Sequence, residues 1–181
     1  MDSRLGPAYG LAASLARAGD SPRVCLVGTA LGDAGDELLA MCGAFGRAGW
    51  RVSGQAMRAA WQAGVVLMGC SAGSVCWFAG GTTDSFGLPL RPVTDGLGFL
   101  PYSNSPHHDA EEQRRPTIHR LIGQGALPDG YASDNGTGLI FEGTDLVDCV
   151  TEVDGARTWQ MTRRPDGTVD EVPLPTRLLS S

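Results

Sequence analysis

An apolar run that ends in a glycine-framed serine limits the folds open to this chain more than any other stretch. Residues Val65–Gly69 are apolar throughout, which is the pattern of a buried strand. They lead into Gly69-Cys70-Ser71-Ala72-Gly73 and then into a helix-forming run. A strand, a sharp turn and a helix in this order form a nucleophile elbow, in which small residues two before and two after the nucleophile relieve crowding. The pattern predicts an exposed Ser71 hydroxyl, with the Ala72 amide N–H aimed at a developing oxyanion.

Two other interpretations of this turn stay open. It can be a tight glycine-rich turn with an unreactive serine, or Cys70 can be the nucleophile, although a residue just before the turn is expected to point away. A serine hydroxyl is a weak nucleophile until a base accepts its proton. Only three imidazoles are available for that task, those of His107, His108 and His119.

Strands and helices alternate along the first half of the chain, which predicts an α/β domain with a mainly parallel sheet. No internal repeat and no low-complexity linker interrupts the sequence, so a single domain over residues 1–181 is expected. The stretch Gly80–Thr94 is rich in Gly, Thr and Pro and is expected to be loop with short extended pieces. The expected strands are Arg23–Gly28, Trp50–Ser53, Val65–Gly69, Arg157–Thr162 and a C-terminal hairpin of Thr137–Phe141 with Leu146–Val150, and the expected helices are Gly35–Ala48, Gln55–Ala63 and Glu111–Gly123.

Composition and charge exclude several classes of function. The net charge is -6 and the isoelectric point about 4.9, so the chain carries no general basic footprint for nucleic acid. All 14 basic residues are Arg, and the absence of Lys excludes a P-loop lysine, a Schiff-base lysine and a Ser-Lys dyad. The five cysteines form no CxxC pair, which argues against a disulfide framework and a structural zinc site. No apolar run approaches the ~20 residues of a membrane span, and no export signal is seen, so a cytoplasmic location is expected.

Two separated motifs resemble one known family. The elbow segment, continuing through Gly81-Thr82-Thr83-Asp84-Ser85, closely resembles the peptidase E (aspartyl dipeptidase) family of serine peptidases, which is related to cyanophycinase. The stretch Ser103-Asn104-Ser105-Pro106-His107-His108-Asp109 resembles the Asn-x-Pro-His block of that family, whose His is the catalytic base. The resemblance runs from about Gly6 to Val150. It implies a flavodoxin-like α/β fold similar to the class I glutamine amidotransferases, with helices on both faces of the sheet and Ser replacing Cys on the elbow.

Carried over by position, the resemblance implies that Ser71 is the nucleophile and His107 the general base. Relatives place an acid just before a short apolar strand, which here is the segment Ser133–Leu139. One register puts that acid at Asp134, which we favour, and a shift by one residue puts Asn135 there. An Asn can orient a catalytic His, although it stabilises imidazolium less well than a carboxylate does.

Five further polar residues are weighed as parts of the implied site. Asp84 matches a family position close to the active site, where it orients His107, contacts substrate or only forms a turn. Arg114 and Arg115 are candidates for binding a substrate carboxylate, with a solvated helix start as the alternative. His108 is expected to line a pocket or to face solvent, and His119, in the middle of a helix, is expected to be structural.

The chain departs from the family pattern in one place. Family members carry a further strand and a Gly-Gly-Asn-Thr loop between the strand near Arg51 and the helix leading into Val65. That loop supplies a second oxyanion donor, and no Gly-Gly-Asn occurs anywhere in this sequence. The first strand of the family also has no counterpart here. Losing one oxyanion donor typically costs about 10²–10³ in turnover.

Three functions follow, in order of preference. The first is a serine-type peptidase acting on short peptides, with an N-terminal Asp as one preference, through a Ser-His-Asp triad. The second is a degenerate, weakly active or inactive relative that acts as a binding or assembly protein. The third is an α/β-hydrolase esterase, which is disfavoured because that fold orders its triad Ser, acid, His. No metal or organic cofactor is implied; the expected partner is a small peptide, with no nucleic acid and no membrane, and a homo-oligomer stays open.

Overall fold

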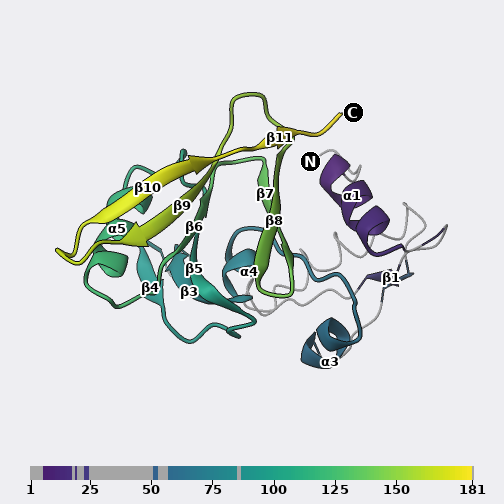
Figure 1. The fold of residues 1–181 in the computed structure, drawn as a ribbon, viewed down its shortest axis with the longest axis horizontal. Helices are drawn as coiled ribbons and strands as arrows, with labels where there is room; N and C mark the ends of the chain where they lie inside the picture. The colour runs from purple at the N-terminus through teal and green to yellow at the C-terminus, as the bar shows by residue number, and fades with distance from the viewer. Residues whose placement is uncertain are drawn as a thin grey trace. The chain divides into compact units, whose positions relative to one another are not determined.

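The computed structural model describes residues 6–17, 19, 23–24, 51–52, 57–84 and 87–180. The chain divides into two units, one within Met1–Met68 and one spanning Gly69–Ser180. Figure 1 labels the elements of both, and each unit is described by itself. None of the helices in the described ranges is long and apolar enough to cross a membrane.

In the first unit the described elements are short. Helix α1 (Pro7–Leu15) begins with a proline, which is well suited to the first helical turn because the N–H it lacks has no partner there. Strands β1 (Arg23–Val24) and β2 (Arg51–Val52) pair in parallel, and helix α3 spans Met57–Gln62. The strands expected over Arg23–Gly28 and Trp50–Ser53 are confirmed at Arg23–Val24 and Arg51–Val52, and the rest of each lies outside the described residues. The helix expected within Gln55–Ala63 is confirmed as α3. The helix expected over Gly35–Ala48 lies outside the described residues.

The strand expected at Val65–Gly69 is wrong. Residues 65–70 form neither helix nor strand, and the side chains of Val65, Val66 and Met68 are about 40% exposed, at 43%, 38% and 40%. A strand needs a hydrogen-bonding partner as well as an apolar sequence. Strand β3 (Phe78–Thr83), which follows the elbow, is already paired on one side with β4 (Arg91–Val93) and on the other with β5 (Leu100–Pro106).

The second unit is built on a six-stranded sheet with the order β10-β9-β6-β5-β3-β4. The neighbours β3, β5 and β6 (Gly130–Ser133) run parallel, whereas β9 (Thr158–Arg163), β10 (Val169–Leu174) and β4 pair antiparallel. The α/β class is confirmed, with a parallel centre and antiparallel margins. The strand expected at Arg157–Thr162 is confirmed as β9.

The stretch Gly80–Thr94 is loop with short extended pieces, as expected: its first residues end β3, and Arg91–Val93 form β4. Gly80 and Gly81 lie in β3, where a Cβ on Gly80 would stand 2.2 Å from the carbonyl oxygen of Val93, and one on Gly81 2.2 Å from that of Asn104. Glycine is needed there because neighbouring backbones approach too closely for a side chain. The central position of β3 in the sheet was not predicted, because glycine that marks close packing and glycine that marks a turn look alike in a sequence.

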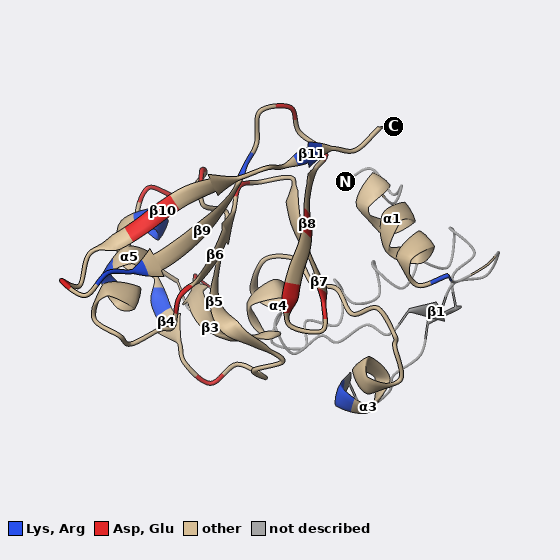
Figure 2. Cartoon of the chain, in the orientation of Figure 1, with Lys and Arg blue, Asp and Glu red and all other residues tan. Residues whose placement is uncertain are grey.

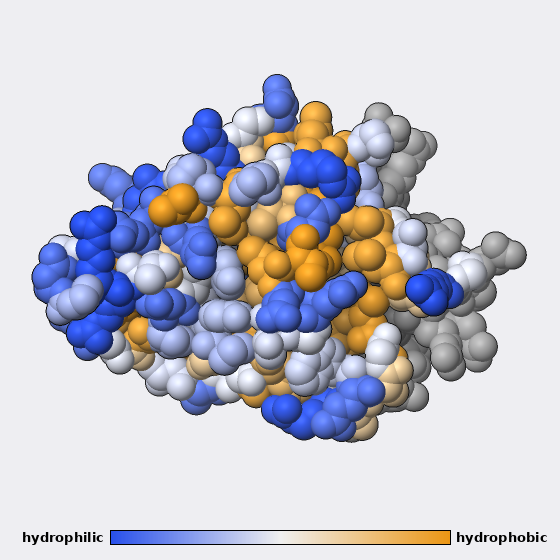
Figure 3. Space-filling model, in the orientation of Figure 1, coloured by the Kyte–Doolittle hydropathy of each residue, from blue (hydrophilic) through white to orange (hydrophobic). Residues whose placement is uncertain are grey.

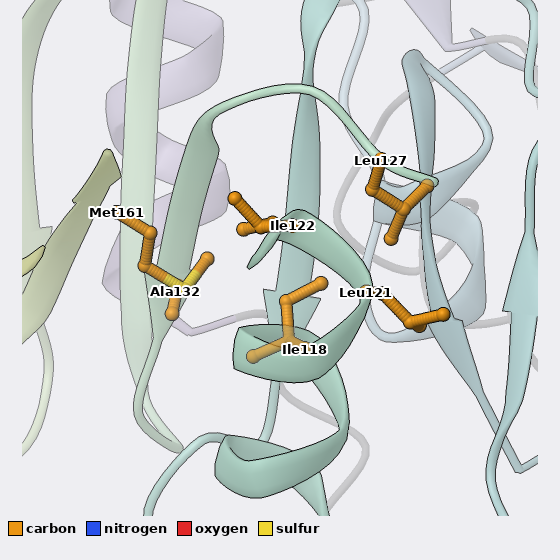
Figure 4. Close-up of a cluster of buried hydrophobic side chains, with 6 residues drawn as sticks. All are labelled: Ile118, Leu121, Ile122, Leu127, Ala132 and Met161. Atoms are coloured by element: carbon orange, nitrogen blue, oxygen red, sulfur yellow. The ribbon is translucent and has the colours of Figure 1, made fainter. Parts of the chain in front are cut away.

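Helix α5 (Arg114–Gly123) covers one face of the sheet, within the expected Glu111–Gly123 helix. Its buried residues pack against β6 and β9 in a cluster drawn in Figure 4: Ile118, Leu121, Ile122, Leu127, Ala132 and Met161. Each fully buried aliphatic side chain of this kind contributes roughly 1.5–3 kcal/mol to stability. Successive strand residues face opposite sides, and a Cβ on Gly80 would contact Leu127 of this cluster whereas one on Gly81 would contact Val75 of helix α4 (Ala72–Val75). Helices therefore lie on both faces.

The expected C-terminal hairpin is confirmed as β7 (Thr137–Glu142) and β8 (Asp145–Thr151), which pair antiparallel and are extended by β11 (Arg177–Leu178). Aromatic and aliphatic side chains of this hairpin, including Phe141, pack on Tyr131 of β6. Tyr131 precedes Ala132 of the α5 cluster, so the hairpin lies on the face of the sheet opposite α5. Several exposed apolar residues lie on β8, on β11 and on the loop after β8, where Figure 3 shows apolar surface: Val147, Val153 and Leu178.

Candidate active site

The turn at Ser71 has the backbone of a nucleophile elbow. Ser71 adopts φ 54 and ψ -126, a conformation that L-residues rarely adopt and that costs on the order of 1–3 kcal/mol. A Cβ on Gly69 would stand 2.0 Å from the carbonyl oxygen of Gly73, so the chain ahead of the turn and the chain after it touch. Both features follow from the Gly-x-Ser-x-Gly pattern. Ala72 begins α4, and its N–H has no acceptor within that helix.

The parallel pairing of β5 and β6 brings the next parts of the site together. Pro106 pairs with Ser133, so the residues that follow each strand leave the same edge of the sheet side by side. The backbone N–H of His108 donates to the carbonyl oxygen of Ser133 at 3.0 Å, which extends the pairing by one step. Ligands of open α/β sheets bind outside the carboxyl ends of parallel strands. His107 and Asn135 lie at this edge.

His107 lies between Ser71 and Asn135. Its Nε2 is 2.8 Å from Ser71 Oγ, and its Nδ1 is 2.5 Å from Asn135 Oδ1. An amide oxygen only accepts hydrogen bonds, so this pairing places the ring proton on Nδ1 and leaves the Nε2 lone pair to accept the Ser71 hydroxyl proton. The arrangement has the geometry of nucleophile, base and orienting residue. His107 also has a positive φ, 55.

Asp134, favoured from the sequence as the third member, does not contact His107. Its Oδ2 accepts the backbone N–H of Arg157 at 2.9 Å and its Oδ1 accepts the indole N–H of Trp159 at 3.1 Å. Both carboxylate oxygens are therefore directed toward β9. The position against His107 is taken by Asn135, the alternative register, whose own backbone N–H donates to Asp109 Oδ1 at 2.8 Å.

Arg114 and Asp84 are not brought to His107 either. The guanidinium of Arg114 is only 1% exposed and donates to the carboxylate of Glu111 and to the carbonyl oxygen of Thr82, at 2.6 and 3.0 Å. Asp84 lies 3.7 Å from the same guanidinium. Arg114 ties the first turn of α5 to the end of β3, so the expectation that it binds a substrate carboxylate is replaced by a structural role.

Two polar side chains, those of Ser74 and Asn104, hold the elbow, and they were not predicted from the sequence. Ser74 Oγ donates to the carbonyl oxygen of Ser71 at 2.6 Å, and Asn104 Nδ2 donates to Ser74 Oγ at 2.9 Å. Asn104 is 2% exposed. It is the Asn of the Asn-x-Pro-His block, and that membership was the signal available before the structure. The same block therefore supplies both the candidate base and a support for the candidate nucleophile.

His108 is buried, contrary to the expectation that it lines a pocket or faces solvent. Its Nδ1 is 3.3 Å from Ser105 Oγ and its Nε2 3.0 Å from Glu171 Oε2. Burial lowers the pKa of the His108 imidazole, and the hydrogen bond and negative charge of Glu171 only partly oppose this. Burial by itself raises the pKa of Glu171, but hydrogen bonds with His119 and His108 outweigh it, so the pKa of this carboxyl lies below its usual range. His108 is therefore neutral and Glu171 charged at neutral pH.

Within the described ranges, no group of three or more His, Cys, Asp or Glu is arranged to hold a metal ion. The chemistry offered by the site is that of the side chains themselves: a hydroxyl, an imidazole able to accept its proton, and an amide that orients the ring.

Comparison with known proteins identifies the family of the chain. The model of peptidase family S51 matches residues 48–148, which include Ser71, His107 and Asn135. The chain is 42% identical over 123 residues to the uncharacterized peptidase YgaJ of Bacillus subtilis (strain 168), a match that covers 68% of this chain and 52% of that protein. The chain thus spans about half the length of this curated relative. No solved structure matches it. On the family match and the identity together, the chain belongs to peptidase family S51, whose peptidase E-like members the two motifs resemble.

Proposed function

We propose that this protein is a serine-type peptidase that uses Ser71 as nucleophile, His107 as general base and Asn135 as the residue that orients His107. The observation that carries the proposal is the position of the His107 ring, 2.8 Å from Ser71 Oγ on one side and 2.5 Å from Asn135 Oδ1 on the other. The strained backbone at Ser71 supports it, since such strain gathers at functional sites.

In the proposed reaction, Ser71 Oγ attacks the carbonyl carbon of a peptide bond while His107 Nε2 takes the hydroxyl proton. The N–H of Ala72 donates to the oxyanion that forms. His107 then gives its proton to the leaving amine, and the acyl-enzyme remains on Ser71. Water, activated by His107, hydrolyses that ester and frees the second product.

Asn135 gives this site a weaker electrostatic support than a carboxylate would. A neutral amide holds the Nδ1–H of His107 in place but supplies no charge opposite the imidazolium that forms. The substrate class we propose is short peptides, and the likeness to aspartyl dipeptidases favours an N-terminal Asp. The triad proposed here replaces the Ser-His-Asp set expected from the sequence with Ser-His-Asn.

A binding or assembly protein is the second candidate, and one observation favours it. No Gly-Gly-Asn stretch, which in relatives supplies a second oxyanion donor, occurs in the sequence. Removing one such donor typically lowers turnover by about 10²–10³. A protein of this kind keeps the Ser71–His107 pair but stabilises the transition state poorly.

The deciding experiment is intact-mass analysis after exposure to a fluorophosphonate. Labelling forms a bond between Ser71 Oγ and phosphorus, releases fluoride and passes the hydroxyl proton to His107. One adduct is expected on the wild type and none on Ser71→Ala, while Ser14→Ala, at an exposed serine of α1, keeps the adduct. An Asp-X dipeptide is then the first substrate to assay. Folded wild type without an adduct contradicts the peptidase proposal and supports the binding protein.

A further inference from the structure

A network of charged and titratable side chains lies next to the candidate base His107 and contains none of the three residues of the proposed triad. Glu171 of β10 is its centre: Oε2 lies 3.0 Å from His108 Nε2 and 2.5 Å from His119 Nε2, and Oε1 lies 3.0 Å from Arg115 Nη2. We call these four residues, His108, Arg115, His119 and Glu171, the Glu171 network. The side chain of His108 is 0% exposed and that of Glu171 10%. Figure 2 shows the acidic stretch of β10, in red, next to α5, which carries Arg115 and His119.

The network holds His108, the residue that follows His107 in the chain. His107 has a φ of 55, which L side chains rarely adopt, so neighbouring groups must keep its backbone in place. His108 is the next residue, and its ring is held by Glu171 and by Ser105 while its backbone N–H is bonded to Ser133. The peptide that leaves His107 is therefore fixed at both the ring and the backbone of His108.

The same network is also linked, through Trp159, to the residue that precedes Asn135. The guanidinium of Arg115 lies over the ring of Trp159, with Cζ 5.1 Å from the ring centre. The indole N–H of Trp159 donates to Asp134, the residue before Asn135, at 3.1 Å. Glu171 is thus linked to both partners of the hydrogen bond between His107 Nδ1 and Asn135 Oδ1. The link to His107 runs through His108, and the link to Asn135 runs through Arg115, Trp159 and Asp134.

We propose that Glu171 is a positioning residue for His107, because it fixes the backbone on which the His107 ring is held between Ser71 and Asn135. The inference rests on the proposed function. It adds a residue of β10, which lies beyond the residues 48–148 matched by the family model. Glu171 touches none of the reacting atoms and acts only through its neighbours.

Glu171 is suited to this role because it is the one group in the network that can neutralise Arg115. Its lowered pKa keeps Glu171 charged near neutral pH, and the lowered pKa of His108 keeps that imidazole neutral. Exchange of Glu171 for Gln removes the charge and replaces one acceptor by a donor. The His108 ring and Arg115 then lose the carboxylate that both contact. The backbone of His107 is then free to relax toward an unstrained φ.

The test compares fluorophosphonate labelling of the wild type, Glu171→Gln and Asp170→Asn. Asp170→Asn is the matched control, because it removes the same charge from the neighbouring residue of β10. Asp170 is paired with Arg164, which lies outside the network. For Glu171→Gln we expect the maximal labelling rate to fall by about 10- to 100-fold, because a small misplacement of the reacting groups lowers a rate to this extent. The probe concentration at half-maximal rate and the final extent of labelling are expected to stay at the wild-type values, which a loss of folded protein would not allow. Asp170→Asn is expected to match the wild type.

A second variant keeps the proposal testable if Glu171→Gln does not fold. Arg115→Met removes the pairing with Glu171 Oε1 at a side chain that is 49% exposed, and a several-fold fall in the maximal labelling rate is expected. A wild-type rate in either folded variant, or an equal fall in Asp170→Asn, overturns the role of Glu171 and leaves the proposed function standing. An unlabelled wild type instead contradicts the proposed function itself, and the inference with it.

Discussion

At the scale of single residues, backbone strain marks the site as clearly as the side chains do. The described residues contain three non-glycine positions with positive φ, namely Arg17, Ser71 and His107. Two of the three are the proposed nucleophile and base, which also hydrogen-bond to each other. Strain of this kind persists only where the surroundings enforce it. The agreement between strain and contact is the residue-level reason for placing the chemistry here.

Asn135 decides how well His107 can act, and two substitutions measure this. Asn135→Ala removes the amide oxygen that accepts the Nδ1–H of His107. The fluorophosphonate labelling rate is expected to fall by a factor on the order of 10²–10⁴, because the His107 ring loses its fixed orientation and tautomer. Asn135→Asp supplies a carboxylate opposite the imidazolium and is expected to label at least as fast as the wild type. Asp134→Asn is the comparison at the neighbouring residue and is expected to slow labelling far less than Asn135→Ala. A larger effect at Asp134 than at Asn135 would return the triad role to Asp134.

Gly69 is expected to tolerate no side chain. Gly69→Ala places a Cβ 2.0 Å from the carbonyl oxygen of Gly73, so the elbow backbone must move, at a cost of roughly 1–3 kcal/mol in the free energy of unfolding. Labelling of Ser71 is expected to be lost or strongly slowed. The control is Gly10→Ala on α1, where a Cβ meets nothing within 4 Å. Urea denaturation and labelling of both variants check this, and wild-type values for Gly69→Ala would show that the elbow is not crowded.

At the scale of elements, the site depends on how β5 joins the elbow to the base. Asn104 lies in β5 and supports Ser71 through Ser74, while His107 follows the end of the same strand. One strand therefore sets the separation between Ser71 and His107, the proposed nucleophile and base. The pairing of β5 with β6 then brings Asn135 to the other side of the ring.

Ser74→Ala tests this support. The substitution removes the hydrogen bond to the carbonyl oxygen of Ser71 and leaves the buried amide of Asn104 without its partner, which costs about 1–3 kcal/mol in stability. The labelling rate is expected to fall more than tenfold, because the elbow loses the group that fixes its carbonyl. Ser180→Ala, near the C-terminus, serves as the control for a serine-to-alanine change. If Ser74→Ala is destabilised but labels at the wild-type rate, the support is structural only.

At the scale of the whole molecule, the Glu171 network makes stability depend on pH. The pKa of His108 is lowered by folding, so the unfolded chain binds the extra proton first, and stability is lost as pH falls through the ordinary His value of about 6.5. The pKa of Glu171 is also lowered, so its contribution is present above the ordinary Glu value of about 4.3 and is lost as pH falls below it. Both effects have the same sign. Each pKa unit of difference between folded and unfolded states corresponds to about 1.4 kcal/mol.

Urea denaturation from pH 7.5 to 4, a range of about three and a half units, measures this dependence. The free energy of unfolding of the wild type is expected to decline toward acid. Glu171→Gln is expected to lose the component below about pH 4.5, whereas Asp170→Asn keeps it. A flat or rising free energy of unfolding on acidification would contradict the burial and pairing described for His108 and Glu171.

Much of the fold was predictable from local patterns, and the failures have two different causes. The hairpin of β7 and β8, strand β9, helices α3 and α5 and the β1–β2 pair lie where apolar spacing and turn residues put them. Strands β5, β6 and β10 were not predicted, because short polar or glycine-containing strands carry no clear periodicity. Val65–Gly69 was wrong for the opposite reason: its composition is that of a buried strand, but none of the described strands pairs with it.

The sequence by itself indicated the family and the α/β class, and it singled out Ser71 as the candidate nucleophile and His107 as the candidate base, because each rests on residue types at fixed local spacing. Only the tertiary structure places Asn135 rather than Asp134 against His107, pairs Arg114 with Glu111 and Asp84, and links Glu171 to His108, the residue after His107. These contacts join residues from different strands and helices, some far apart along the chain. Strand register and packing set such distances, and a side chain one residue along a loop turns to a different neighbour, so no local pattern specifies them.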